Sequence, residues 1–422
     1  MRRTDAGQWT TRWAAAAAWP VIAVLTIACG GAEASRPTPG VAGDTITVGA
    51  LSPLSDAVAV IGKPIVAGLQ AYVDRLNERG GVAGRYRVRL LVEDVAYINP
   101  SSSAQKYQKI KGDVAMMAQI LGTDHINTVL PLLAEDSVVA VPTTFDADWV
   151  REPHLIPWGP AYQLSAINGI GYYLTEGGGA GKRVCALTIA TGYGQAGLEG
   201  VEFAAKELGF EIAATARFKQ DDQDFVAPIT QLRNAKCDAV FLVSLPGVTG
   251  RLLGAAAQLG FAPQWIALVP SWAPSLAESA LKDYYAEHLL LAWDGPEWGD
   301  TTVTGMREML AALAKFKPDQ KPDVYAAVGW NLGYIVHQTL ERAVASGDLT
   351  RPGLLRAVEQ LGTLSFDGMF SPYTYGAASA RAPSRMASIF RINPAKPVGL
   401  ELVKKNFESP AAEKFVFHAK AR

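Results

Sequence analysis

The chain has 422 residues, more than one compact core ordinarily holds, and this length fits two domains of average size. Hydrophobic residues make up 49% and charged residues 19%, a balance typical of globular rather than disordered proteins. The formal net charge of -1 provides no basic surface for nucleic acid, so we expect no nucleic-acid partner.

The first 29 residues read as an export signal rather than as part of the fold. Three arginines within the first 12 residues are followed by an apolar stretch over residues 14–28. Residues 25–29 (Leu-Thr-Ile-Ala-Cys) then match a lipobox, in which the cysteine is lipidated and becomes the mature N-terminus. A transmembrane anchor is disfavoured, because spanning a bilayer takes about 20 apolar residues. We therefore expect lipidation at Cys29.

A tether follows the lipidated cysteine. Residues 30–43 are rich in Gly, Ala, Pro and Ser, which predicts a flexible linker between anchor and fold. Acyl chains on Cys29 would hold the protein in the cell envelope, at the outer face of the cytoplasmic membrane or in the periplasm. No later segment reads as a transmembrane span.

From residue 46 onwards, apolar runs typical of strands alternate with helical periodicity. The pattern occurs once before a glycine-rich stretch at residues 177–181 and once after it. The predicted strands are 46–51, 88–92, 114–120 and 138–141 in the first copy and 184–189, 212–218, 239–243 and 265–269 in the second. Repeated strand–helix alternation requires parallel sheets with right-handed crossovers. The fold class is therefore α/β, with two doubly wound parallel-sheet lobes.

The remaining chain must add to sheets that are already formed. Residues 289–292 read as a strand, and strong helices are predicted over 301–315 and 322–346. A short helix begins near Arg351, and residues 386–392 predict another strand. The chain is thus expected to cross between the lobes more than once.

Two cysteines remain after the predicted lipidation site. Cys185 and Cys237 both stand at the start of predicted strands. An export compartment permits a disulfide. Strand starts rarely offer disulfide geometry, however, so two buried thiols are the favoured interpretation.

Seven short motifs lie at residues 46–53, 68–77, 80–84, 92–94, 99–100, 193–194 and 224–225. In this order and spacing they resemble the type I periplasmic binding proteins, specifically the leucine/isoleucine/valine-binding branch. The resemblance implies a Venus-flytrap receptor, with two lobes joined by three crossovers and a small ligand trapped between them. It also implies delivery to the permease subunits of an ABC importer, by a monomer without enzymatic activity or cofactor. A ligand-binding sensor on the same fold, signalling to a membrane or regulatory partner, is the alternative.

The resemblance also implies discontinuous lobes. Lobe 1 would comprise residues 44–162 and 289–365, and lobe 2 residues 163–288 and 366–403. Residues 404–422 would then form a C-terminal tail.

The ligand is expected beyond the carboxyl ends of the parallel strands, where open α/β sheets bind their ligands. Small residues, hydroxyls and aromatic rings gather at these positions. The candidate ligand-binding residues are Ser52, Thr123, Thr143, Thr144, Phe145, Tyr193, Ser244, Ser271 and Trp272.

Several chemical motifs have simpler explanations. Residues 192–197 spell the dinucleotide fingerprint G-x-G-x-x-G, but the expected acid at the end of the next strand is missing, and residues 193–194 already fit the binding-protein pattern. The five histidines show no metal-ligand spacing, and no nucleophile elbow occurs. We therefore expect no catalytic residue, metal or cofactor.

The resemblance bears on the ligand as well. In the branched-chain amino-acid binders, a serine and a threonine hold the ligand carboxylate, and an acid from the second lobe holds the ammonium. Thr123 matches the serine, Phe145 falls where the threonine aligns unless Thr144 replaces it, and Ser271 or Trp272 falls where the acid should be. Either another acid such as Asp146 enters the site, or the ligand is not a conventional α-amino acid. Rings near the site favour an aromatic acid, an amide or a similar small metabolite.

Overall fold

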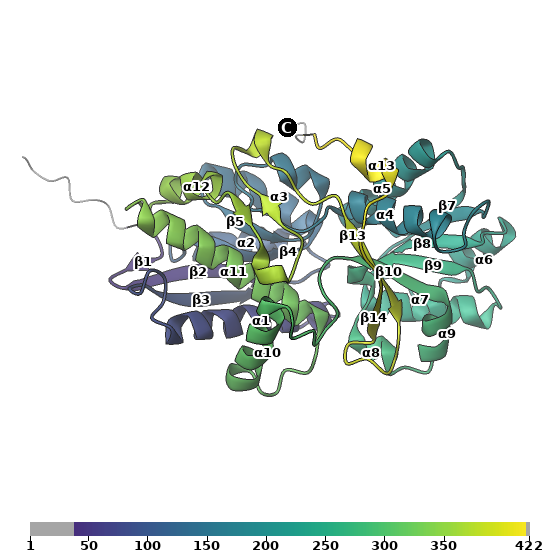
Figure 1. The fold of residues 1–422 in the computed structure, drawn as a ribbon, viewed down its shortest axis with the longest axis horizontal. Coiled ribbons are helices and arrows are strands. Elements are labelled where there is room, and N and C mark those ends of the chain that lie inside the picture. The colour runs from purple at the N-terminus through teal and green to yellow at the C-terminus, as the bar shows by residue number, and fades with distance from the viewer. Residues whose placement is uncertain (1–37, 419–422) are drawn as a thin grey trace, which may run out of the picture. The chain divides into compact units, whose positions relative to one another are not determined.

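The computed structural model describes residues 38–418, in which helices flank two main β-sheets (Figure 1). The predicted lipidation site at Cys29 and most of the predicted tether lie outside the described residues. Within residues 38–418, no helix combines the length and apolarity needed to cross a membrane.

The first sheet is built from the first copy of the sequence pattern. Its central strand pairs in parallel with the next two strands of the chain, and the last strand extends the sheet. The strands are β1 (Val41–Ala42), β2 (Thr45–Ser52), β3 (Arg87–Asp94), β4 (Met116–Leu121) and β5 (Ala140–Thr143). The helices on this side are α1 (Ala59–Glu78), α2 (Ser101–Ile110), α3 (Thr123–Glu135), α10 (Thr304–Phe316), α11 (Val324–Ala345) and α12 (Arg351–Glu359).

Glycine allows α1 and α11 to pack closely. A Cβ atom at Gly68 would lie 2.0 Å from the backbone oxygen of Ala326, and one at Gly329 would lie 1.9 Å from that of Ile65. Helices separated by so little space tolerate only glycine at these positions. This contact places α11, from late in the chain, against the first lobe, and it brings Tyr325 to the cleft described below.

The second sheet has the order β14-β13-β10-β9-β8-β6-β7. Its strands are β6 (Val184–Ile189), β7 (Ile212–Phe218), β8 (Ala239–Val243), β9 (Gln264–Leu268), β10 (Leu289–Trp293), β13 (Ala387–Ile392) and β14 (Leu400–Phe407). The first five are parallel, whereas β13 and β14 add an antiparallel edge. The helices of this lobe are α4 (Tyr162–Thr175), α5 (Gly192–Leu208), α6 (Val226–Asn234), α7 (Pro246–Gln258), α8 (Pro274–Ala277), α9 (Lys282–His288) and α13 (Pro410–Lys414).

The predicted fold class is confirmed: each copy of the pattern forms one lobe around a largely parallel sheet. Every predicted strand is present within a few residues of its expected bounds. The sequence reading missed α4, whose residues are buried almost all round and therefore carry little helical periodicity. It also missed the edge strand β14, whose alternation is interrupted by two lysines.

The predicted lobe boundaries need three corrections. Strand β10 pairs with β9 and β13, so it belongs to the second lobe rather than the first. Residues 366–368 contact α10 and α11 of the first lobe, although residue 366 was expected to begin a return to the second. The predicted tail at residue 404 begins inside β14. In each case, strand pairing or helix contact decides to which lobe the segment belongs, and neither can be predicted from the sequence of one segment alone.

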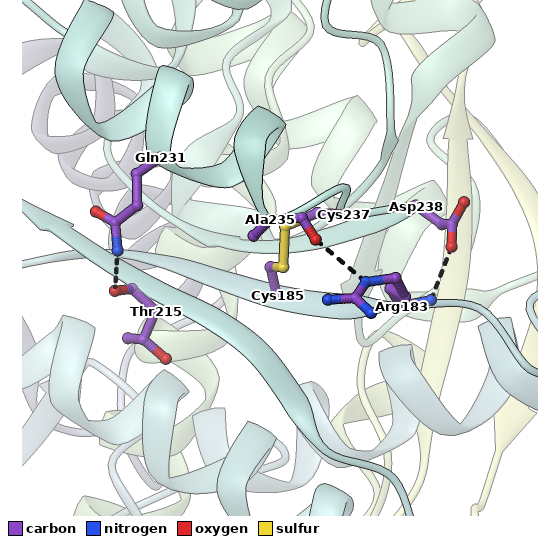
Figure 2. Close-up of a disulfide and its surroundings, with 7 residues drawn as sticks. All are labelled: Arg183, Cys185, Thr215, Gln231, Ala235, Cys237 and Asp238. Atoms are coloured by element: carbon purple, nitrogen blue, oxygen red, sulfur yellow. Dashed lines mark hydrogen bonds between the residues drawn. A yellow bond between two sulfur atoms is a disulfide. The ribbon is translucent and has the colours of Figure 1, made fainter.

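Cys185 and Cys237 form a disulfide, so the favoured interpretation of two free thiols is wrong (Figure 2). The bond joins β6 to the turn before β8, two strands that are direct neighbours in the sheet. Beside it, the backbone N–H of Arg183 donates to Asp238 at 2.8 Å, and Arg183 Nε donates to the carbonyl of Ala235 at 3.1 Å. These contacts draw the turn against the start of β6 and bring the two sulfur atoms together.

We predict that the double substitution Cys185→Ala/Cys237→Ala lowers the free energy of unfolding by about 2–4 kcal/mol, because the bond closes a loop of 52 residues. Urea unfolding of oxidised and reduced protein measures the loss. The matched control is the reductant itself: it should destabilise the wild type to the level of the double variant and leave the variant unchanged. Equal stability of oxidised wild type and variant would contradict the prediction.

Candidate functional site

Three connections join the lobes: residues 144–161, 294–303 and 365–386. An aromatic cluster forms where they meet, made of Phe145 and Trp158 from the first connection, Trp293 at the end of β10 directly before the second, and Phe370 from the third. Ring centroids lie 4.8 Å apart for Phe145–Trp158, 4.9 Å for Trp158–Phe370, 5.9 Å for Phe370–Trp293 and 5.5 Å for Trp293–Phe145. All four contacts are edge-to-face, the arrangement that aromatic quadrupoles favour. We call this closed ring of contacts the hinge cluster.

Polar contacts fix the same connections. The buried carboxylate of Asp294 accepts hydrogen bonds from the Ser371 backbone N–H at 2.9 Å, the Ser371 hydroxyl at 2.8 Å and the Gly295 N–H at 2.8 Å. The hydroxyl of Tyr375 donates to the carbonyl of Pro157 at 2.7 Å. The second connection is thus tied to the third, and the third to the first.

An inner cavity lies directly against the hinge cluster, with an empty volume of about 470 Å³. Strand ends from both sheets and the start of α11 supply its walls. The lining residues are Ile61, Ile65, Tyr97, Leu121, Gly122, Thr123, Thr143, Thr144, Phe145, Tyr162, Tyr193, Leu245, Val269, Pro270, Trp293, Tyr325 and Val328. None of these side chains carries a charge at neutral pH.

The polar atoms of the inner cavity are hydroxyls. Thr123 Oγ1 and Thr144 Oγ1 bond to each other at 2.7 Å, whereas Thr143 Oγ1 is buried without a hydrogen-bond partner among the described residues. Burial raises the pKa of Tyr193 and of Tyr325 well above the usual value for a phenol, so both stay neutral. The cavity therefore suits an uncharged group that can hydrogen-bond.

Five of the nine candidate residues line the inner cavity: Thr123, Thr143, Thr144, Phe145 and Tyr193. Thr144 and Phe145, the two alternatives for the threonine position, both line this cavity, because they follow the end of β5 directly. This part of the site depends on strand ends, and strand ends were well predicted.

The other four candidates lie outside the lining. Ser271 Oγ accepts from the Ser244 N–H at 3.0 Å and donates to the Ser244 carbonyl at 3.1 Å, and Ser244 Oγ donates to the Leu245 carbonyl at 3.3 Å. Ser52 is fully buried and accepts from Gln119 Nε2 at 2.9 Å. Trp272 is 0% exposed, and its Nε1–H donates to the Val398 carbonyl at 3.1 Å. In all four residues, the polar group of the side chain is already hydrogen-bonded within its own lobe.

The lining residues that the sequence reading missed come mainly from helices. Ile61 and Ile65 face the cavity from α1, and Tyr325 and Val328 from α11. Tyr162 begins α4, which was not predicted. Tyr325 carries no sequence signal of its own, because only the α1–α11 contact brings it to the cleft.

Tyr325 also spans the two lobes. Its hydroxyl, carried by α11 of the first lobe, donates to the Trp272 carbonyl at 2.7 Å and lies 3.1 Å from the Val269 carbonyl in the second. The inner cavity is therefore closed on this side by a protein hydrogen bond.

Two outer cavities adjoin the inner one. The first, of about 790 Å³, shares Tyr97, Thr123 and Tyr193 with it and adds Asp124, Lys219 and other polar residues. The second, of about 940 Å³, shares Leu245 and reaches Arg251. Charge thus enters the cleft only outside the inner cavity.

Asp146, the alternative acid for a ligand ammonium, does not line the inner cavity. Its Oδ1 accepts from the Asp148 N–H at 3.2 Å and from Gln163 Nε2 at 3.1 Å, and Gln163 Nε2 also donates to Glu199 at 3.2 Å. Burial raises the pKa of Asp146 to about 6, opposed by the hydrogen bond from Gln163.

This pKa predicts a pH dependence of stability. Because the folded-state value of about 6 lies above the unfolded value of about 3.9, the native state binds more protons in that interval, and the contribution of Asp146 to stability is lost as pH rises from about 4 to 6. The difference in free energy of unfolding between wild type and Asp146→Asn should fall over that range and level off above pH 6. Urea unfolding at several pH values measures it, with the exposed Asp319→Asn as control. A difference independent of pH would refute the assignment.

Comparison with known proteins places these features in a family. The family model described as periplasmic binding protein matches residues 45–397. The Leu/Ile/Val-binding protein BraC3 of Rhizobium johnstonii is 25% identical over 203 residues, which is 46% of this chain and 53%, about half, of that protein's length.

Solved structures share the fold over most of the chain. A fatty acid ABC transporter substrate-binding protein from Thermomonospora curvata is 25% identical, with a TM-score of 0.84, over 91% of this chain and 97% of that one. A branched-chain amino acid ABC transporter protein from Thermus thermophilus, with bound valine, is 17% identical with a TM-score of 0.75 over 89% and 99%. The second likeness concerns the fold alone.

Proposed function

This chain belongs to the periplasmic binding protein family of ABC transporters, whose members bind solutes and are not enzymes, and we propose that it captures a small ligand with an uncharged, apolar body and delivers it to an ABC importer. The uncharged lining of the inner cavity carries the proposal. A family role outside the cytoplasm agrees with the Cys185–Cys237 disulfide, since such bonds persist in oxidising compartments.

The lining disfavours a conventional α-amino acid. Burying an ammonium without a carboxylate partner costs several kcal/mol, and no acid lines the inner cavity. An amide fits better, as does an aromatic acid whose carboxylate stays outside the inner cavity, with the ring among Phe145, Tyr162 and Trp293. Thr143 Oγ1, which lacks a partner among the described residues, is then free to bond the ligand's polar group.

A fatty acyl chain is the second candidate. The Thermomonospora curvata protein is named as a fatty acid binder and is 25% identical to this chain. Ile61, Ile65 and Val328 give one wall of the inner cavity an aliphatic surface that such a chain could bury.

We predict that phenylacetamide, phenylacetate or decanoate binds more tightly than leucine, isoleucine or valine in isothermal titration calorimetry. Tyr193→Ala should weaken the best of these ligands by about 1–3 kcal/mol through loss of ring contact. Thr143→Val should weaken it by about 0.5–1.5 kcal/mol through loss of one hydrogen bond.

Thr188→Val is the matched control, because Thr188 Oγ1 is also buried without a partner among the described residues but lies outside the inner cavity. It should leave affinity unchanged. Micromolar leucine binding that Tyr193→Ala does not affect would show that an ordinary amino-acid site survives.

We also propose that acylation of Cys29 anchors the receptor to the membrane, on the grounds of the lipobox at residues 25–29. Cys29→Ala should then release the protein into the soluble fraction of fractionated cells, with its circular dichroism spectrum unchanged. A variant that stays wholly membrane-bound would contradict lipidation at this residue.

A further inference from the structure

One carboxylate bridges the two lobes at the rim of the cleft. Asp124 lies in the first turn of α3, in the first lobe, and its Oδ1 and Oδ2 lie 3.1 and 3.3 Å from the backbone nitrogen of Gly192, the first residue of α5 in the second lobe. A Cβ atom at Gly192 would stand 2.6 Å from Asp124 Oδ1 and 2.9 Å from Thr123 Cγ2. Glycine at this position therefore permits the approach.

The charges at this contact are complementary. The N-terminus of a helix carries roughly half a positive charge, and both α3 and α5 begin here. Thr191 caps α5 by accepting from the Gly194 N–H at 3.3 Å, and Gly122 gives α3 no side-chain cap. Asp124 thus supplies negative charge to two helix starts that face each other. Without it, closure would bring two positive helix ends together.

The surrounding outer cavity carries more negative than positive charge. Besides the neutral phenols of Tyr97 and Tyr193, its ionisable side chains are Asp124, Asp221, Lys219 and His125. Burial lowers the pKa of His125, whose ring nitrogens already bond to Ser103 at 2.6 Å and to the Tyr97 carbonyl at 2.9 Å. A ligand carboxylate entering beside Gly192 would therefore meet two carboxylates and one lysine.

We propose that Asp124 is a built-in counter-anion that latches the lobes together and selects against ligands with a negative charge on this side of the cleft. The selectivity part rests on the proposed function and deepens it. Because the Asp124 carboxylate already supplies the negative charge at the two helix starts, the end of the ligand next to Thr123 and Gly192 is uncharged. The latch part concerns closure alone and is independent of the ligand's identity.

The latch is tested without ligand. Asp124→Asn removes the charge and keeps an acceptor of the same shape, and Gly192→Ala keeps the charge but blocks the approach. Glu135→Gln, an exposed substitution at the other end of α3, is the matched control for lost charge. Small-angle scattering should give a larger radius of gyration for both test variants than for wild type and control. Hydrogen exchange at residues 192–195 should rise about tenfold.

Circular dichroism must be unchanged in every variant, so that altered exchange reports opening rather than unfolding. Asp124→Asn and Gly192→Ala test the latch by opposite means, and agreement between them excludes a merely local effect. If both variants give the same radius of gyration and the same exchange rates as Glu135→Gln, the latch is overturned. This holds also if the wild type is already open without ligand, since the variants then cannot open it further.

Selectivity is tested with a matched pair of probes, phenylacetamide and phenylacetate. Wild type should prefer the neutral amide, and Asp124→Asn should reduce the ratio of affinities by about tenfold, since like-charge repulsion is then gone. Equal ratios in wild type and Asp124→Asn would overturn the selectivity. If neither probe nor any fatty acid binds wild type, the proposed ligand class fails, whereas scattering and exchange still decide the latch.

Discussion

The hinge cluster is the constraint on which the site depends, because it joins all three connections and forms one side of the inner cavity. Phe145 and Trp293 belong both to the ring of edge-to-face contacts and to the cavity lining. Each such contact contributes about 0.5–1.5 kcal/mol beyond the area it buries, and contacts that share residues are not additive. A ligand touching Phe145 therefore acts on the geometry of the connections directly, without an intervening chain of residues. If the ligand binds there as proposed, binding and lobe position are coupled through the same rings.

Near this apolar centre, buried and half-buried carboxylates accept hydrogen bonds from the backbone where the chain turns. Asp294 binds N–H groups of two connections, Asp146 caps the turn after β5, and Asp323 caps α11 through the Tyr325 N–H at 2.9 Å. Burial raises the pKa of all three, and that of Asp323 to about 7. None of these acids lines the inner cavity. The frame is thus fixed by local polar contacts, and the cavity is left to hydroxyls and apolar groups.

The sequence predicted the lobes well because alternating strands and helices are a local signal, and strand ends followed from it. Thr143, Thr144 and Phe145, which line the inner cavity, were proposed as candidates in this way. What it could not predict depends on long-range contacts. Tyr325 reaches the cleft only because Gly68 and Gly329 let two helices touch. Ser271 does not line the cavity, because its hydroxyl is hydrogen-bonded to the backbone of Ser244 at the end of the neighbouring strand. The disulfide was misjudged for the same reason, since the turn before β8 sets its geometry rather than the strand starts alone.

The contacts that hold the lobes together are therefore made by other atoms than those that would recognise the ligand. In the amino-acid binders that the sequence resembles, charged groups of the ligand meet both lobes. Here protein atoms make contacts across the cleft, from Tyr325 to the Trp272 carbonyl and from Asp124 to Gly192. The proposed ligand would then contribute mainly burial of apolar surface, worth roughly 25 cal/mol per Å². Because one methylene in an apolar pocket changes binding by only about 1–3 kcal/mol, such a division favours a receptor that accepts several ligands of similar shape over one that selects a single metabolite.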